Sequence, residues 1–488
     1  MSTFQVLFFL LSAVVGLLQM PSPSGAIVYY VKPTDNDSEA CDCSLASMNT
    51  SAEDLWLCMT LNDYAKIFKS CDLLILCIDM DITMIFLPGE HRLEVGLYIH
   101  NRRALKMVKC DHHTSTLVPG IESCSCHREV EIQLLHNASM TFSMITQFTL
   151  DGIVISSTSD TMTSLILNNI PWHRYHYHRH LDHDLLLNIT DVHLNGSSLM
   201  HECDSCSGKV NWQNVSLEDS STAFRIKDSH ILLSNITSVY LTRSSLMYEC
   251  DNSSGALTWQ NVSFEDSFAT FRIKNSHGVL TDITSVHLTT SALIHECDNC
   301  SGEVNWRNLS FENSSTTFRI KNSRDLLSNI TSVHLIKRST LMYECNNSSG
   351  EVNLQGLLFE ASTATFSIKS SHDLLSNITS VHLIKRSTLM YECNNSSGEV
   401  NLQGLLFEAS TATFSIKSSH DLLSNIASVH LIKRSTLMYE CNNSSGEVNL
   451  QGLLFEASTA TFSIKSSCLL YTSPSPRDAT LSRMPSSA

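Results

Sequence analysis

The histidines of one short tract are the residues best suited to hold a metal ion. His176, His178 and His180 alternate with other residues in the hydrophilic stretch 172–184. Side chains two residues apart lie on the same side of an extended chain, and imidazole nitrogens are good ligands for Zn²⁺ and Cu²⁺. The stretch also carries arginines, which repel a cation, so a connecting loop is the favoured interpretation. We expect no cofactor, and these three histidines are the metal-ligand candidates.

Carboxylates that could act as general acid and base are not gathered at any one place in the sequence. Enzymes that hydrolyse glycans need such a cluster beside the bond that breaks. The most conspicuous charged motif, Arg-Ile-Lys, instead occurs at 225–227, 272–274 and 319–321, and becomes Ser-Ile-Lys in later copies. A catalytic site is unique, whereas a structural surface repeats. The motif therefore indicates a solvated strand face, and we expect no catalytic residue and no enzymatic activity.

Two cysteine pairs have the spacing of local disulfides. Two residues separate Cys203 from Cys206, and two separate Cys297 from Cys300. This spacing suits a disulfide or part of a zinc site. The chain has 17 cysteines, and the signs of export described below favour disulfides over zinc. We expect both pairs to be closed.

These residues belong to a chain that repeats itself. Phenylalanines recur at intervals of 47 or 48 residues, at Phe224, Phe271, Phe318, Phe366, Phe414 and Phe462. Each interval divides into two units of about 24 residues, a length typical of solenoid repeats. Both units have the pattern N-Φ-x-x-Φ-x-Φ, where Φ is apolar, as in Asn329–Leu335 and Asn353–Phe359. About twelve units occupy residues 181–467. One unit has too little apolar surface to fold alone, so the units must stack into a continuous core.

The pattern within each unit predicts strands. Its Φ-x-Φ end alternates apolar and polar residues, as in a strand with one buried face. A second piece, such as Phe318–Lys321, alternates in the same way, and Gly, Asn and Ser clusters separate the pieces. We predict an all-β fold, a right-handed parallel β-helix solenoid of about 24 residues per coil with a small disulfide-tied N-terminal cap. The alternative is a leucine-rich-repeat solenoid, which places its Asn or Cys after the apolar motif rather than before it.

Asparagine occupies the position before the first apolar residue in ten of the twelve units. Asn tolerates the left-handed backbone of tight turns, and stacked asparagine amides can bond from one strand to the next. We predict a ladder of asparagines at a bend of the solenoid. Its members are Asn188, Asn211, Asn235, Asn305, Asn329, Asn353, Asn377, Asn401, Asn425 and Asn449.

The N-terminal region resembles a known family. Tyr29–Thr34, Cys58–Tyr64 and Phe86–Leu93 are similar to the opening of secreted pectin-lyase-like repeat proteins with a right-handed parallel β-helix, of the kind predicted in sponges. The resemblance covers residues 29–155 directly. It implies that a short helix at roughly 55–68 caps the first coil, and it says almost nothing about activity.

Both ends of the chain carry segments that we expect to lie outside the fold. Residues 1–26 have the apolar core and the small residues before the cleavage point that define a signal peptide. Residues 468–488 resemble the translation of a sequencing adapter, and we expect them to be foreign. Between these segments we expect a Cys-rich cap at 27–81 and irregular first coils at 82–180, which end in the His-rich connector.

Composition and glycosylation motifs indicate the cell exterior. The formal net charge of −16 argues against nucleic acid, and no segment after the signal peptide is long and apolar enough to span a membrane. Asn346, Asn394 and Asn442 begin N-x-S motifs in Ser/Gly-rich turns that suit glycosylation. We predict a secreted, glycosylated scaffold with an extracellular protein or glycan partner. The alternatives are a carbohydrate-active or carbohydrate-binding β-helix protein and a leucine-rich-repeat-type recognition ectodomain.

Overall fold

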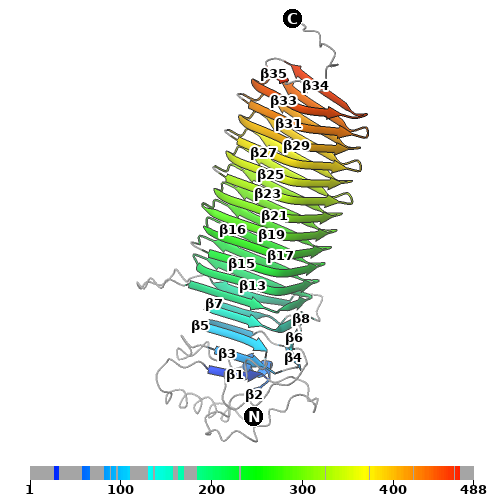
Figure 1. Ribbon diagram of the computed structural model, residues 1–488. Helices are drawn as coiled ribbons and strands as arrows, with labels where there is room; N and C mark the ends of the chain where they lie inside the picture. The colour runs from blue at the N-terminus through cyan, green and yellow to red at the C-terminus, as the bar shows by residue number, and fades with distance from the viewer. Residues whose placement is uncertain are drawn as a thin grey trace, which may run out of the picture.

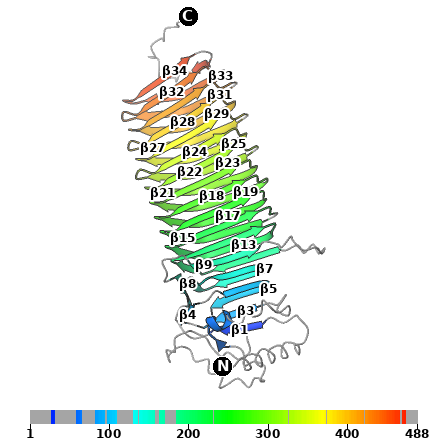
Figure 2. The same ribbon diagram turned by 180° about the vertical axis from the view of Figure 1, so that it is seen from behind.

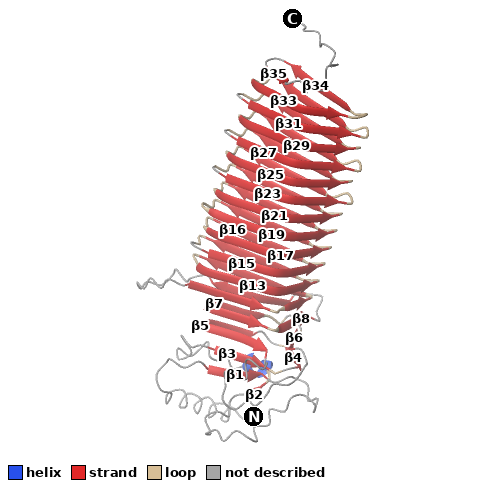
Figure 3. Ribbon diagram, viewed as in Figure 1, coloured by secondary structure: helices blue, strands red, loops and turns tan. Residues whose placement is uncertain are grey.

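The computed structural model describes most of the chain between residues 27 and 472. The described ranges are 27–31, 58–65, 82–87, 89–94, 97–109, 130–135, 138–157, 163–169, 184–229, 232–324, 326–372, 374–420, 422–465 and 468–472. The expected signal peptide and the metal-ligand candidates His176, His178 and His180 lie outside these residues. In the described ranges the chain forms 35 strands and one helical turn at 61–65 (Figure 3).

The strands before residue 184 are irregular in length. They are β1 (Ile27–Val31), β2 (Cys58–Met59), β3 (Ile82–Phe86), β4 (Gly89–Leu93), β5 (Leu97–Lys109), β6 (Val130–Leu134), β7 (Met140–Asp151), β8 (Ile153–Ser157) and β9 (Thr163–Asn169). The next three, β10 (Asp184–Thr190), β11 (His193–Asn195) and β12 (Ser197–Asp204), lead into the regular part.

From β13 onward, long and short strands alternate. The long strands are β13 (Ser207–Glu218), β15 (Leu232–Thr242), β17 (Gly255–Glu265), β19 (Val279–Thr289), β21 (Gly302–Glu312), β23 (Leu326–Ile336), β25 (Gly350–Glu360), β27 (Leu374–Ile384), β29 (Gly398–Glu408), β31 (Leu422–Ile432) and β33 (Gly446–Phe455). The short strands are β14 (Ser221–Lys227), β16 (Ser245–Asp251), β18 (Phe268–Lys274), β20 (Ala292–Asp298), β22 (Ser315–Lys321), β24 (Thr340–Asn346), β26 (Thr363–Lys369), β28 (Thr388–Asn394), β30 (Thr411–Lys417), β32 (Thr436–Asn442), β34 (Thr459–Lys465) and the terminal β35 (Cys468–Thr472).

Strands two apart in the chain pair in parallel, so that the coils stack into a rod. β25, for example, pairs with β23 on one side and β27 on the other, and the short strands stack in the same way, as β26 does between β24 and β28. Figures 1 and 2 show the stacked strands from two opposite sides of the rod. The predicted parallel β-helix is confirmed, with about 24 residues per coil. The leucine-rich-repeat alternative is wrong, because every regular coil carries two strands and, among its described residues, no helix.

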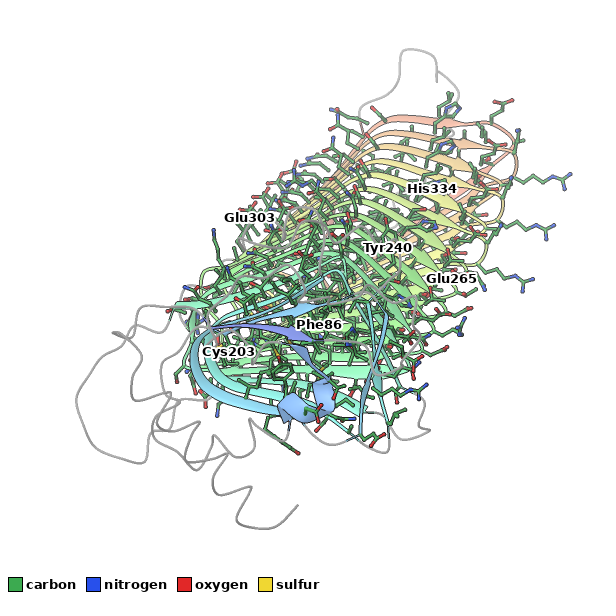
Figure 4. All side chains as sticks on the ribbon, turned by 90° about the horizontal axis from the view of Figure 1, so that it is seen from below. Phe86, Cys203, Tyr240, Glu265, Glu303 and His334 are labelled. Atoms are coloured by element: carbon green, nitrogen blue, oxygen red, sulfur yellow. A yellow bond between two sulfur atoms is a disulfide. The ribbon has the colours of Figure 1, made fainter. Side chains whose placement is uncertain are left out.

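Each regular coil has three sides separated by corners. A residue with positive φ bends each long strand; in β23 it is Ser332 (φ 56°), which divides side A (326–331) from side B (333–336). Arg338 (φ 68°) lies at the B–C corner before the short strand, which is side C, and Asn347 (φ 51°) lies at the C–A corner. Figure 4 shows Tyr240 and His334 together on side B, and Glu303 on side A.

The core is a stack of apolar columns, which the alternation in the sequence predicted. Side A contributes buried Trp212, Trp259 and Trp306, and side C contributes an aromatic from each coil. The two series meet edge to face: the ring centroids of Trp306 and Phe318 are 4.9 Å apart at 82°. Offset and edge-to-face aromatic pairs add about 0.5 to 1.5 kcal/mol each beyond the area they bury.

A column of buried serines follows each of the B–C and C–A corners. At the B–C corner the amide of Ser267 donates to Oγ of Ser291 (3.0 Å), and the hydroxyl of Ser267 donates to the carbonyl of Glu265 (2.6 Å). At the C–A corner Ser323 and Ser348 are linked in the same way (3.1 Å). These hydroxyls satisfy corner backbone amides that the strand ladders cannot reach. The serine columns were not predicted, although the sequence carries a signal for them. A polar residue followed directly by Ser recurs after many of the strands.

The asparagine ladder forms, but not at a bend. Asn353 donates from Nδ2 to Oδ1 of Asn329 (2.9 Å), and Asn377 donates likewise to Asn353 (2.8 Å). The bonds run without a break from Asn305 to Asn449, and one more joins Asn211 to Asn188 (2.8 Å). Between these two stretches the column is interrupted by Thr258 and Asp282, and within the described residues Asn235 makes no bond to another ladder asparagine. The expected turn position is wrong, because these residues lie within the strands of side A on its outer surface. The corner residues are those three positions later, where φ is positive.

The segment 468–488, which we expect to be foreign, contributes one strand to the fold, and its origin stays a prediction. Cys468–Thr472 form β35, which pairs in parallel with β33. The physical reason is that the last coil offers a row of unpaired backbone groups, with which an extended segment can pair. Of the helical residues that the structure describes, none form a stretch long and apolar enough to cross a membrane.

Candidate functional site: a groove along the B–C corner

An open groove of about 610 Å³ runs along the B–C corner, parallel to the rod axis. Successive coils each contribute one corner residue to one wall: Asp219, Arg243, Asp266, Thr290, Asn313 and Arg338. The first residue of each side C forms the other wall: Ser245, Phe268, Ala292, Ser315 and Thr340. The buried serines of the corner, from Ser220 to Ser314, make the floor. The shape therefore suits an extended molecule that lies across several coils.

The floor is already satisfied by the chain itself. The amide of Ser244 donates to Oγ of Ser267 (3.0 Å), and the hydroxyl of Ser244 donates to backbone carbonyls within hydrogen-bond distance. The floor serines thus hold the shape of the groove. Its recognition chemistry comes from the two walls.

The corner wall is polar, and its central cation is neutralised. Arg243 donates to both carboxylate oxygens of Asp219 (2.7 and 2.8 Å) and to Glu218 (2.8 Å). The hydrogen bond from Arg243 lowers the pKa of Asp219, so this carboxylate stays ionised. On the next coils, the hydroxyl of Thr290 donates to Asp266. The wall therefore presents carboxylate, guanidinium, hydroxyl and amide groups in a row.

Phe268 is the feature that breaks the regularity of the groove. Its column carries small residues in neighbouring coils: Ser221, Ser245, Ala292, Ser315 and Thr340. The Phe268 side chain is 42% exposed, and it is the one aromatic residue among those that line the groove. An exposed aromatic face beside hydrogen-bonding groups is typical of a binding site rather than of a structural surface.

One carboxylate of the groove does not suit the general acid of a glycosidase. Such enzymes need one carboxyl group whose pKa is raised, so that it can donate a proton at neutral pH. The lining residues include two carboxylates, Asp219 and Asp266, and the pKa of Asp219 is shifted in the opposite direction. Asp219 is therefore ionised, and it can accept hydrogen bonds from a ligand rather than donate a proton.

The Arg-Ile-Lys motifs lie on side C, next to this groove. Their arginines alternate with glutamates: Arg272 pairs with Glu249 (2.8 Å) and Glu296 (3.1 Å). Arg319 forms ion pairs in the same way with Glu296 (2.6 Å) and Glu344 (2.8 Å). Burial opposes ionisation of Glu296, but the hydrogen bonds from Arg272 and Arg319 outweigh it and lower its pKa. The motif is thus part of an ion-pair ladder on a strand face.

The structure places both cysteine pairs at the C–A corner, where cysteine replaces the corner serine. Cys203–Cys206 and Cys297–Cys300 are disulfides with Cα atoms 5.9 Å apart. Cys250, Cys345 and Cys393 lie in the same inward column as Cys203, and they are buried thiols because the residue three positions later is serine. Burial raises the pKa of Cys345 to about 11, which keeps it protonated and unreactive. Cys441 is disulfide-bonded.

The glycosylation candidates are less accessible than the sequence suggested. Asn346 ends strand β24 and is half-buried, with its Oδ1 atom enclosed and unpaired; Asn394 and Asn442 are placed alike. The neighbouring asparagines Asn347, Asn395 and Asn443 lie at the C–A corner and are exposed. They also begin N-x-S motifs. The structure therefore favours the second asparagine of each pair.

Comparison with known proteins adds little to this picture. No family model and no curated protein matches the chain. A variant of the periplasmic alginate epimerase AlgG is similar at 10% identity over 79% of this chain and 78% of that one, with a TM-score of 0.19. The catalytic domain of a GH87 α-1,3-glucanase in complex with nigerose shares 9% identity over 91% of this chain and 69% of that one, with a TM-score of 0.19. The A-module of the Azotobacter vinelandii mannuronan C-5 epimerase AlgE6 shares 10% identity over 85% and 96% of the two chains, with a TM-score of 0.18. At these TM-scores the likeness carries no argument about function.

Proposed function

We propose that this protein is an extracellular β-helix scaffold that binds a neutral glycan chain along the B–C corner without cleaving it. The exposed ring of Phe268 in a groove walled by hydrogen-bonding groups is the observation that carries the proposal. A sugar ring has an apolar face, which can pack on an aromatic ring, and hydroxyls that need several donors and acceptors. This corner supplies both.

A neutral ligand fits the charges better than an acidic one. Of the two arginines that line the groove, the central one, Arg243, is already held by Asp219 and Glu218, and Arg338 lies at the end of the groove. The formal net charge of −16 repels polyanions from the rod as a whole. The two disulfides in the regular coils support export, since disulfides persist in oxidising compartments.

Replacement of Phe268 tests the binding site directly. Phe268→Ser restores the small residue of this column and is expected to weaken binding to a neutral polysaccharide by about tenfold, because the stacking surface is lost. Binding is measured on the whole chain by isothermal titration against soluble glucan, mannan and xylan, one at a time. The matched control is Tyr240→Ser, which removes a 53% exposed aromatic on side B, where Ser216 and Ser263 are its neighbours.

The control variant should bind as the unaltered chain does. If none of the three polysaccharides binds the unaltered chain, or if Phe268→Ser binds as tightly as Tyr240→Ser, the groove is not the glycan site. The same samples are expected to release no reducing sugar above a buffer blank. Product release that is abolished by Asp266→Asn would contradict the non-catalytic interpretation.

Glycopeptide mass spectrometry of secreted protein is expected to find glycans on Asn347, Asn395 and Asn443. These side chains are exposed at a corner, and the contacts that their amides make, such as Asn347 to Oδ1 of Asn322 (2.8 Å), are themselves exposed. The ladder asparagines Asn329 and Asn377 also begin N-x-T motifs, but each amide is bonded to the coils on both sides. They are expected to be bare, and heavy occupancy there would show that the ladder does not form.

A further inference from the structure

Side C changes its charge pattern in the later coils. From β26 onward the positions of Arg225, Arg272 and Arg319 are taken by Ser367, Ser415 and Ser463. The glutamates of the alternate coils remain. Within the described residues, Glu392 and Glu440 therefore have no ion-pair partner, unlike the glutamates of the earlier coils.

New arginines arise in the same coils, but at the B–C corner. Arg338, Arg386 and Arg434 are exposed and have positive φ. In the part of the chain that the structure describes, none of the three makes an ion pair. The lysine before each does: Lys385, for example, contacts Glu360. Each of the three coils thus carries an unpaired guanidinium at one edge of side C.

Exposed methionines lie between the two charged columns. Met342, Met390 and Met438 are 40%, 36% and 36% exposed, and threonines surround them on β24 to β34. The surface of these six short strands is a strip with arginines at one edge, methionines in the middle and glutamates toward the other edge. The pattern recurs in every second coil, at intervals of roughly 9.6 Å if the strands keep their usual spacing.

We propose that this strip is the contact surface of a parallel dimer of this chain. A two-fold axis parallel to the rod, through the methionine column, turns the strip onto itself. Arg386 then faces the partner's Glu392, and Glu392 faces the partner's Arg386. The two columns stay in register along the rod because both residues belong to one coil. The methionines meet at the centre, where they lose exposed apolar surface.

The size of the strip is adequate for such a dimer. Six strands at ~4.8 Å and seven residues at ~3.3 Å give roughly 650 Å² on each copy, or about 1,300 Å² in total, within the range of specific interfaces. The earlier coils cannot extend the contact, since Arg225, Arg272 and Arg319 already neutralise their own glutamates. The glycan groove centred on Phe268 lies mainly on those earlier coils, and it meets the strip at Arg338 and Thr340, which line its last coil.

Charge exchange between two variants tests the dimer. One variant carries Arg386→Glu and Arg434→Glu, and the other carries Glu392→Arg and Glu440→Arg. Each alone is expected to self-associate about tenfold more weakly than the unaltered chain, because like charges face each other across the axis. An equimolar mixture is expected to form a heterodimer, since each variant supplies the charge that the other now lacks.

Sedimentation velocity over a range of concentrations measures all three samples, and circular dichroism confirms that each variant is folded. Arg324→Glu is the matched control: it makes the same charge change at an exposed site before β23, and it should dimerise as the unaltered chain does. The proposal is overturned if the unaltered chain stays monomeric, if either double variant dimerises normally, or if the mixture does not associate. Growth into open-ended oligomers would also overturn it, since a two-fold contact closes.

Discussion

Acidification from pH 7 to pH 4 is expected to lower the free energy of unfolding by about 6 kcal/mol, through two buried histidines whose pKa values differ between the folded and unfolded chain. His201 and His295 lie in the aromatic column of the core, and burial lowers the pKa of each from 6.5 to about 4. A shift of one pKa unit is worth about 1.4 kcal/mol. At pH 4 the unfolded chain can take up a proton on each histidine that the folded chain excludes, and this lowers the free energy of unfolding by about 3 kcal/mol per histidine.

The sign of this effect is fixed by the direction of the shift. Because the folded pKa lies below the unfolded one, the unfolded chain binds more protons between pH 6.5 and 4. Stability is therefore complete above pH 6.5 and is lost as the pH falls toward 4. The charge of Glu296, next to His295, opposes the shift of the pKa of His295, but burial outweighs it. Neither ring nitrogen of His201 has a hydrogen-bond partner, so no contact holds a proton there.

The chain itself supplies the matched variant. Tyr248 and Tyr343 occupy the position of these histidines in other coils, so His201→Tyr with His295→Tyr fits the column and removes both titrating groups. Urea unfolding followed by circular dichroism at pH 7, 5.5 and 4 compares the two chains. The double variant is expected to lose about 6 kcal/mol less than the unaltered chain over this range, because the linked proton uptake is gone. Equal losses would place the acid sensitivity elsewhere.

The sequence predicted the architecture because a solenoid is periodic. Where the residue pattern of one coil is ambiguous, the same pattern in the next coil removes the ambiguity. The apolar columns and the alternation of strands could therefore be recognised from residue spacing alone. The register of the asparagine ladder could be recognised in the same way. Its place in the coil could not, because Asn is common both at left-handed corners, as Asn347 is, and in mid-strand ladders, as Asn353 is.

The candidate site was missed for the opposite reason. The coils are recognised by residues that recur, whereas the groove is marked by a residue that does not recur. Phe268 was visible as the one aromatic in a column of Ser, Ala and Thr, but its significance depends on exposure, and the pattern alone cannot separate an outward aromatic from a core one. The side chains that wall the groove come from the ends of six coils, and only the fold brings them together.

Gly350→Ala is expected to destabilise the rod by about 3 kcal/mol or more, because backbone strain and a backbone clash act together. Gly350 begins β25 with φ at +136°, a backbone conformation that is essentially confined to glycine. A Cβ atom there would lie 2.2 Å from the carbonyl oxygen of Leu326 and 2.7 Å from its nitrogen. Leu326 is the residue paired with Gly350 in the parallel ladder, so neither backbone can move without loss of strand pairing.

Gly356→Ala, six residues later, is the control that separates the clash from the general cost of a positive φ. Gly356 has φ at +66°, and the nearest atom to an added Cβ is the nitrogen of Ser332 at 3.6 Å. Ser332 and Ser380 adopt this conformation at the equivalent corners, so an alanine should cost only about 1 kcal/mol. Urea unfolding of the two variants at neutral pH measures the difference. If both alanines cost the same, the close approach of adjacent coils at the start of each long strand is not a constraint on the fold.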